Sequence, residues 1–242
     1  MTIEKKTILI TGGTSGVGLA LVDLLSKTNK VYIISRQGAL PEHLKQNSSI
    51  ELFHADLSDK RQLEKVVDDL LRKESSIDVL FNNAAVQHTP EFLEDNFNYD
   101  GIQREVDVNF TAICHLTYLL LPALMNSSSG KIVNINSGLA IAPKRASAIY
   151  CATKSALDSF SKSLSYQLAD SHVAVSQVFL PLVETNMTLG RGTKKLRPDF
   201  VAEKIWQGIT EGKSVIDIGK VKLLRAINYI LPTVAQNIMK RS

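Results

Sequence analysis

Cysteine is scarce in this sequence of 242 residues, which contains only Cys114 and Cys151. The two lie far apart and form no CxxC pair, so we expect neither a disulfide framework nor a cysteine-based metal site. The five histidines also lack the spacing of metal ligands, and we expect no metal site. This composition is typical of an intracellular protein in a reducing compartment, and we expect a cytoplasmic location.

Long apolar runs are missing as well. Pro122 interrupts Leu116–Met125, and no run approaches the roughly 18 residues that a membrane span requires. A strand-like segment begins at Thr7 after a short charged lead, which argues against a secretory signal. Apolar residues make up 44% and charged residues 21%, close to the values of soluble globular proteins. Because no linker, repeat or low-complexity tract divides the chain, we expect one domain over residues 1–242.

Basic residues are unevenly distributed. The net charge is +4, but the part from Thr188 onward holds eleven Lys and Arg against four Asp and Glu. No dense Lys/Arg run or nucleic-acid-binding motif accompanies this bias, so we expect no nucleic-acid partner. The basic part forms either a solvated surface or a contact for an anionic substrate carrier or a membrane surface.

Apolar runs of strand length alternate with segments of helical periodicity, which predicts a parallel sheet covered by helices on both faces. Right-handed crossovers make this an α/β, doubly wound Rossmann fold with about seven strands. The expected helices are Gly16–Lys27, Asp59–Lys73, Gln103–Leu124, Ser147–Ala169 and Asp199–Glu211. The expected strands are Thr7–Thr11, Val31–Ser35, Glu51–His54, Asp78–Phe81, Lys131–Ile135, Val173–Leu180 and Ser214–Ile218.

A glycine-rich loop, TGGTSGVG at Thr11–Gly18, follows the first strand, with Gly12, Gly16 and Gly18 spaced as GxxxGxG. Glycine permits unusual backbone angles and lets the main chain approach a pyrophosphate closely. The helix that begins near Gly16 points its free N–H groups at the phosphates. The loop is therefore expected to bind a dinucleotide.

The second strand ends in Ser35-Arg36. An NAD-preferring site usually has Asp or Glu there, which accepts a hydrogen bond from the ribose 2′-OH. A guanidinium instead suits a 2′-phosphate. The pair favours NADP(H), with NAD(H) as the alternative cofactor.

Tyr150 and Lys154 lie four residues apart at the start of a predicted helix and share one face. A cation near a phenol favours the phenolate and brings its pKa toward the range useful for proton transfer. Tyr150 can donate a hydrogen bond to the carbonyl oxygen of a substrate, and Ser137, at the end of the preceding strand, can donate a second one to the same oxygen. The three residues indicate proton transfer coupled to hydride transfer.

The ordered set of these motifs resembles the short-chain dehydrogenase/reductase family. It comprises TGGTSGVG at Thr11–Gly18, NNAA at Asn82–Ala85, Asn109, Ser137, YCATK at Tyr150–Lys154, and Pro181 with Thr185. The resemblance covers about residues 5–219 and is strongest to the bacterial DltE-type oxidoreductases. Three features depart from the family pattern: Leu182 and Ala85 each replace a glycine, and the helix after the second strand is short.

The resemblance implies roles for the matching residues. Tyr150 would be the general acid in reduction and the base in oxidation, and Ser137 would orient the carbonyl. Lys154 would hold the nicotinamide ribose and lower the pKa of Tyr150. Asn109 would support a water in a proton relay. The cofactor would contact Gly12, Thr14, Ser15, Gly16, Val17, Gly18, Ser35, Arg36, Asp56, Leu57, Asn83, Ala84, Tyr150, Lys154, Pro181, Val183 and Thr185.

We therefore expect an NADP(H)-dependent oxidoreductase that transfers a hydride between the nicotinamide and a carbonyl or secondary alcohol. The alternative is an NADP(H)-binding redox sensor without turnover. The resemblance implies a homodimer or homotetramer, formed through Gln103–Leu124 and Ser147–Ala169.

Two late segments carry further expectations. A basic lid over about residues 184–211 covers the substrate and attracts anions. The segment over about 220–242 either packs as a helical cap broken at Pro232 or meets a membrane or an acyl carrier. The spacing of residues in these two segments does not indicate which compound is the substrate.

Overall fold

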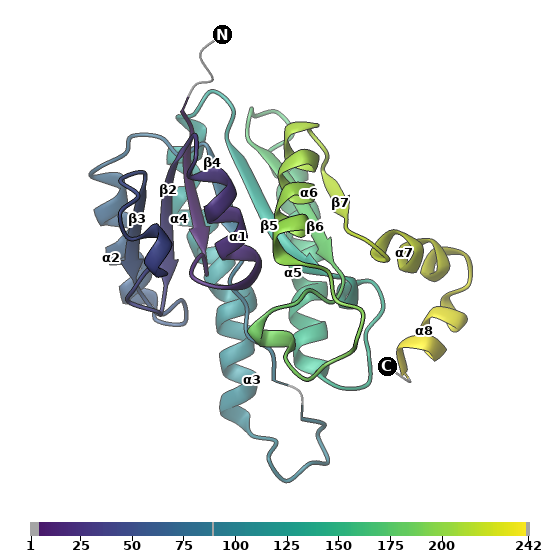
Figure 1. Ribbon diagram of the computed structural model, residues 1–242. Coiled ribbons are helices and arrows are strands. Elements are labelled where there is room, and N and C mark those ends of the chain that lie inside the picture. The colour runs from purple at the N-terminus through teal and green to yellow at the C-terminus, as the bar shows by residue number, and fades with distance from the viewer. Residues whose placement is uncertain (1–4, 89, 241–242) are drawn as a thin grey trace.

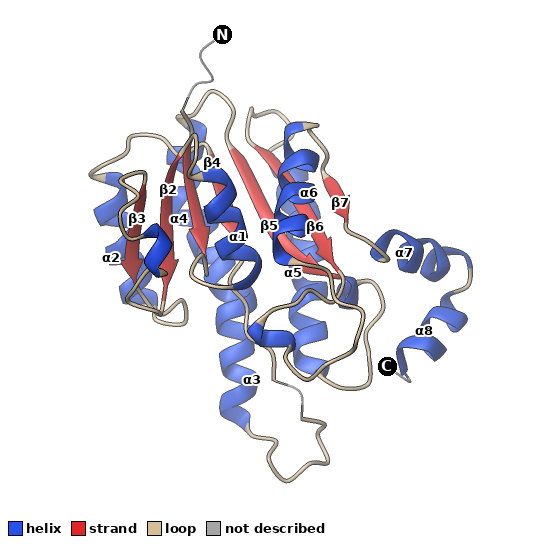
Figure 2. Ribbon diagram, in the orientation of Figure 1, coloured by secondary structure: helices blue, strands red, loops and turns tan. Residues whose placement is uncertain are grey.

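The computed structural model describes residues 5–88 and 90–240 and contains one sheet of seven parallel strands. Figures 1 and 2 show the sheet between two layers of helices. The strand order is β3-β2-β1-β4-β5-β6-β7. This confirms the doubly wound parallel sheet expected from the sequence. The strands are β1 (Thr7–Thr11), β2 (Lys30–Ser35), β3 (Ile50–His54), β4 (Val79–Asn82), β5 (Lys131–Ser137), β6 (Ala174–Leu180) and β7 (Val215–Asp217).

The central strands are apolar because both faces of the sheet are covered. All four residues of β4 are buried, and so are four of the five in β1. The chain leaves β1 toward β2 on one side and reaches β4 on the other, so the strand order reverses between β1 and β4. In open parallel sheets, ligands bind at the carboxyl ends of the strands beside such a reversal.

Two apolar clusters fill the space between the sheet and the helix layers. One packs β1, β2 and β5 against α1 (Gly16–Leu25) and α6 (Pro198–Thr210). The other packs the opposite face against α2 (Lys60–Leu71), α4 (Ala112–Met125) and α5 (Ala148–Gln167). Only a short 3-10 turn, Glu42–Leu44, lies between β2 and β3, as the sequence predicted.

The long helix before β5 begins earlier than predicted. It comprises α3 (Tyr99–Val106), a π turn at Asp107–Thr111, and α4. Asn98 caps its start, with its side-chain oxygen accepting from the Gly101 N–H at 2.8 Å. By length and hydropathy alone, the whole helix could cross a membrane, but half of its apolar window is buried inside the protein.

Two short helices follow β7 and form an arm beside the sheet (Figure 1). They are α7 (Val221–Ile230) and α8 (Pro232–Lys240), and α8 begins at Pro232. Val221 and Ala235 are buried. Tyr229 and Ile230 are 89% and 71% exposed, so much of the apolar surface of the arm faces outward.

Candidate active site

A cavity of about 980 Å³ opens at the carboxyl ends of the strands. The loops after β1 to β6 all contribute to it, together with residues of α5, α7 and α8. It lies at the upper end of the usual volume range for ligand sites. Every residue expected to contact the cofactor lines this cavity, and so does Ser137.

The glycine loop has the backbone that its sequence predicts. Gly12 and Gly16 have φ values of +69° and +55°, a region that other residues rarely adopt. A Cβ on Gly18 would lie 2.2 Å from the main-chain oxygen of Gly12. Ser15 precedes α1 without a side-chain cap, which leaves the first-turn N–H groups for a ligand. This cradle fits a pyrophosphate.

Ser35 and Arg36 lie beside the glycine loop. The Ser35 hydroxyl is 2.8 Å from that of Thr14 and accepts from the Gln37 N–H at 3.1 Å. Arg36 is exposed, and in the described part of the chain its guanidinium forms no ion pair. An unpaired cation at this position suits a 2′-phosphate.

Asp56 follows β3 and is held by its neighbours. It accepts from Arg104 at 2.8 Å and from the N–H and hydroxyl of Ser58 at 2.9 Å and 2.8 Å. Burial acts to raise the pKa of Asp56, but these hydrogen bonds outweigh it and keep the pKa below its ordinary value. The carboxylate is therefore charged at neutral pH, and Leu57 follows it in the cavity wall.

The segment after β4 is fixed to the glycine loop. The Thr11 hydroxyl accepts from the N–H groups of Asn83 and Ala84, both at 3.0 Å. The Asn83 amide donates to the Thr11 carbonyl at 2.9 Å. One residue earlier, Asn82 donates to the Asn134 side chain at 2.8 Å, which ties β4 to β5.

The Ser137, Tyr150 and Lys154 side chains come together where β5 ends and α5 begins. The Ser137 oxygen accepts from the Leu139 N–H at 3.1 Å and also hydrogen-bonds Tyr150. The Lys154 ammonium donates to the Ile135 carbonyl at 2.8 Å. It lies 5.7 Å from the centre of the Tyr150 ring.

Burial sets the proton affinities of this group. It raises the pKa of Tyr150 above its ordinary value, and the bond to Ser137 opposes this only in part. It lowers the pKa of Lys154 to about 8. Desolvation penalises the charged form of each side chain. Tyr150 is therefore a protonated phenol at neutral pH, ready to donate.

Asn109 lies behind the cavity, not in its wall. It is fully buried in the π turn, and its amide oxygen accepts from the Val86 N–H at 2.8 Å. Its amide nitrogen donates to the Val86 carbonyl, also at 2.8 Å. The Asn109 side chain thus braces the segment after β4.

Several residues of the cavity were not predicted from the sequence. They are Gln87, Leu139, Lys144, Met187, Leu224 and Ile238, which lie beyond the proposed cofactor residues. Among the basic residues of the lid, Arg191 lines the cavity and donates to the Gln87 side chain. A serine directly before a helix usually caps it, but the Ser147 hydroxyl does not cap α5. Ser147 has a φ of +63°, and its hydroxyl is buried without a partner in the described part of the chain.

Comparison with known proteins points to the family that the sequence motifs resemble. Residues 6–195 match the short chain dehydrogenase family. The uncharacterized oxidoreductase DltE of Bacillus subtilis is 34% identical over 235 residues, covering 93% of this chain and 92% of its own.

Solved structures share the fold. A short-chain dehydrogenase from Sphingobium yanoikuyae in complex with NADPH has a TM-score of 0.81 at 26% identity, covering 97% of this chain and 95% of its own. A 3-ketoacyl-(acyl-carrier-protein) reductase from Brucella melitensis complexed with NADH has a TM-score of 0.80 at 26% identity, covering 88% and 96%. With the glycine cradle and the Ser137, Tyr150 and Lys154 group at one end of a parallel sheet, the chain belongs to the short chain dehydrogenase family of oxidoreductases.

Proposed function

We propose that the chain is an NADP(H)-dependent carbonyl reductase in which Tyr150 acts as the general acid, and as the base in the reverse direction. The observation that carries this proposal is the position of Ser137, Tyr150 and Lys154 in the same cavity as the glycine cradle. The nucleotide supplies the hydride when it is bound. The residues of the chain supply the proton, the orientation of the carbonyl and the exclusion of water.

The proton chemistry follows from burial and hydrogen bonding. Tyr150 is 8% exposed and keeps its proton at neutral pH, so it can donate to the carbonyl oxygen as negative charge develops there. The Ser137 oxygen accepts from Leu139, and when a carbonyl oxygen replaces the contact with Tyr150, the Ser137 proton can be donated to that oxygen. Two donors aimed at this oxygen make the carbonyl carbon a better hydride acceptor.

Lys154 and Asn109 support this group. Lys154 is fixed by the Ile135 carbonyl, from where its remaining protons can reach a ribose hydroxyl or a water near Tyr150. Both polar atoms of the Asn109 side chain already bond Val86. A water in a proton relay would therefore use the Asn109 main-chain carbonyl, not its side chain.

Arg36 is the reason to prefer NADP(H) over NAD(H). It is exposed at the cavity beside Ser35 and Thr14 and has no carboxylate partner in the described part of the chain. The similar solved structures hold NADPH in one case and NADH in another, so the fold accommodates either. A guanidinium at this position adds charge-assisted hydrogen bonds only to the phosphorylated nucleotide.

The activity can be tested by following the oxidation of NADPH and of NADH at 340 nm with a panel of ketones and aldehydes. We expect carbonyl-dependent oxidation, faster with NADPH. NADPH binding, measured separately by fluorescence titration, provides the second readout. Tight binding without oxidation by any carbonyl would favour the alternative, a nucleotide-binding regulator.

We also propose a homodimer or homotetramer formed through α4 and α5. Tyr118 on α4 and Tyr166 on α5 are each 76% exposed, and Met125 at the end of α4 is 40% exposed. Large apolar side chains exposed on two adjacent helices are typical of a subunit contact.

A further inference from the structure

The cavity extends beyond the residues proposed to bind a nucleotide. Its wall also contains Gln87, from the segment after β4, and Arg191, from the lid loop. The two are joined by a hydrogen bond from the Arg191 guanidinium to the Gln87 side-chain oxygen. Leu139, whose N–H bonds the Ser137 oxygen, and Lys144 also line the cavity. Arg191 is close enough for its charge to act on both Lys144 and Tyr150, so we place the rest of a carbonyl substrate beside these residues.

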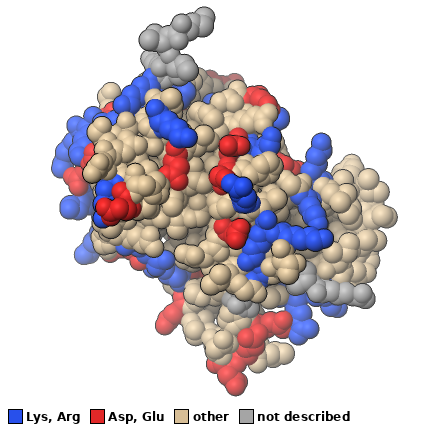
Figure 3. Space-filling view, viewed as in Figure 1, with Lys and Arg blue, Asp and Glu red and all other residues tan. Residues whose placement is uncertain are grey.

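The charges in the cavity wall are strongly unbalanced. Five of its described residues are cations, namely Arg36, Lys144, Lys154, Arg191 and Lys220. The described residues of the wall include one carboxylate, Asp56, and Arg104 already pairs with it. Figure 3 shows Lys and Arg side chains gathered around the lid loop and the start of α7. Arg36 and Lys154 serve the nucleotide in the proposed function, and Lys220 is exposed, which leaves Lys144 and Arg191 as the half-buried cations of the wall.

Lys144 and Arg191 lack the counter-ions that half-buried cations usually have. Neither forms an ion pair within residues 5–88 and 90–240, and the Arg191 guanidinium donates instead to the neutral amide of Gln87. Burial lowers the pKa of Lys144, and the nearby charge of Arg191 lowers it further. Two cations that repel each other in a partly dry pocket are stabilised when an anion binds between them.

Glu105, whose pKa responds to the charge of Arg191, does not balance this pair. Glu105 is 1% exposed and lies outside the cavity wall, where one carboxyl oxygen accepts from the His88 N–H. Burial raises the pKa of Glu105 to about 7, even though Arg191 acts to lower it. The carboxyl is therefore only partly charged at neutral pH.

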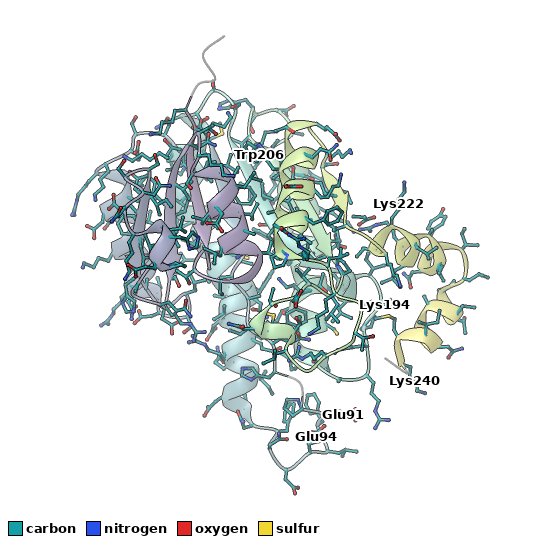
Figure 4. All side chains as sticks on the ribbon, viewed as in Figure 1. Glu91, Glu94, Lys194, Trp206, Lys222 and Lys240 are labelled. Atoms are coloured by element: carbon teal, nitrogen blue, oxygen red, sulfur yellow. The ribbon has the colours of Figure 1, made fainter. Side chains whose placement is uncertain are left out.

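The other three cations of the loop before α6 differ from Arg191. The Lys195 ammonium donates to the Thr188 carbonyl, and Arg197 pairs with Asp199. Lys194 lies on the same loop, exposed and outside the cavity wall (Figure 4). Only Arg191 among these four lid cations is therefore placed to contact a substrate, and Lys194 is a matched control.

We propose that Lys144 and Arg191 bind an anionic group of the substrate, a carboxylate or a phosphate, at a fixed distance from its carbonyl. The apolar side chains of Leu139, Met187 and Leu224 would hold the hydrocarbon that joins the two groups. This inference rests on the proposed function, because it takes the substrate to be a carbonyl compound reduced at Tyr150. It makes the two cations specificity-determining residues.

The test uses the full chain with a ladder of straight-chain keto acids, from 4-oxopentanoate to 8-oxononanoate, each paired with its primary amide. Keto phosphonates of the same lengths distinguish phosphate from carboxylate recognition. The variants are Arg191→Gln and Lys144→Gln, with Lys194→Gln as the control. We expect one chain length to be favoured, with kcat/KM for the anion lowered roughly 10- to 100-fold by either cavity variant. The amide rates, the NADPH dissociation constant and the Lys194→Gln rates should stay close to wild type.

Three outcomes would overturn the proposal. Equal rates for acid and amide in the wild-type protein would show that the cations do not recognise the substrate. Parallel losses for NADPH binding and for both substrates would assign the cations to the nucleotide. An equal loss of kcat/KM for the anion in Lys194→Gln would show that the cations act only by long-range attraction.

A binding measurement separates this inference from the proposed function. Calorimetry with hexanoate, octanoate and hexanamide needs no turnover. If no carbonyl is reduced but carboxylate binding depends on Lys144 and Arg191, the anion site stands and the reductase proposal fails. If neutral ketones are reduced but carboxylates bind no better than amides, the reductase stands and the anion site fails.

Discussion

Glu105 should lower the free energy of unfolding as the pH rises, and Glu105→Gln should remove this dependence. Its carboxyl is buried on α3, with one oxygen bonded to the His88 N–H and the other without a hydrogen-bond partner among the described residues. Tyr150 and Cys151 on α5 lie close enough for the charge of Glu105 to raise their pKa values, and Arg191 on the lid acts to lower the pKa of Glu105. Burial dominates and raises the pKa of Glu105 from 4.5 to about 7.

The sign and size of the effect follow from linkage. Between pH 4.5 and 7 the folded protein keeps the Glu105 proton that the unfolded chain has lost, so the free energy of unfolding falls as the pH rises. At about 1.4 kcal/mol per pKa unit, the full effect is about 3.5 kcal/mol, of which about 2.5 kcal/mol falls between pH 5 and pH 8. The penalty is absent well below pH 4.5 and fully present above pH 7.

The measurement is urea unfolding of the nucleotide-free protein from pH 5 to pH 8, followed by circular dichroism and by the fluorescence of Trp206. Glu105→Gln keeps the bond to the His88 N–H and adds a buried donor, whose cost of about 1–3 kcal/mol does not change with pH. The variant should therefore gain about 2.5 kcal/mol relative to wild type over this range. Glu203→Gln, at an exposed position on α6, controls for the loss of a surface charge. Parallel pH profiles for wild type and Glu105→Gln would refute the reasoning. If the variant instead became more stable relative to wild type as the pH falls, Arg191 would stabilise the Glu105 carboxylate.

The remaining predictions concern the proposed activity and contacts. Tyr150→Phe should abolish carbonyl reduction while NADPH binding stays close to wild type, and retention of more than a few per cent of kcat would contradict its role as proton donor. Arg36→Asp should erase a preference for NADPH of roughly 10- to 100-fold in kcat/KM, and equal values for the two cofactors in the wild type would contradict the assignment. Light scattering should give a dimer or tetramer that Tyr118→Asp and Tyr166→Asp weaken, whereas a wild-type mass of 26.6 kDa would exclude both assemblies. The protein should sediment with phosphatidylglycerol vesicles through the α7–α8 arm, and Ile230→Asp should remove this binding. If the wild-type protein does not bind the vesicles, the arm is a cap on the domain and not a membrane contact.

The strands were predictable because parallel strands buried on both faces appear as short apolar runs. TILIT at Thr7–Thr11 has the predicted bounds in the structure. The start of α3 was not predictable in the same way, because YDGIQREV contains a glycine and three charged side chains, and its first turn is set by the Asn98 cap. Local apolar periodicity carries no information on such a cap.

The residues proposed to bind the nucleotide could be named from the sequence because they occur at fixed spacing within short segments. Gly12, Gly16 and Gly18 lie in one segment, TGGTSGVG, and Tyr150 and Lys154 lie one turn apart on the same helix. The proposed substrate site depends instead on distant segments that meet only in the folded chain. Gln87 and Arg191 are 104 residues apart, and neither position contains a spacing signal.

Opposite pKa shifts at Tyr150 and Lys154 bear on the direction of the reaction. In the proposed mechanism, reduction needs a protonated Tyr150, and burial provides it across the neutral range. Oxidation by the same mechanism needs a deprotonated Tyr150 next to a charged Lys154, and in the nucleotide-free protein these conditions conflict. Lys154 loses its charge from about pH 8, whereas the raised pKa of Tyr150 keeps its proton well above that pH. An anionic nucleotide beside the ammonium would favour the charged form of Lys154. The reverse reaction should therefore depend on cofactor binding to set the charge state of Lys154, while the forward reaction finds its proton donor ready in the folded chain.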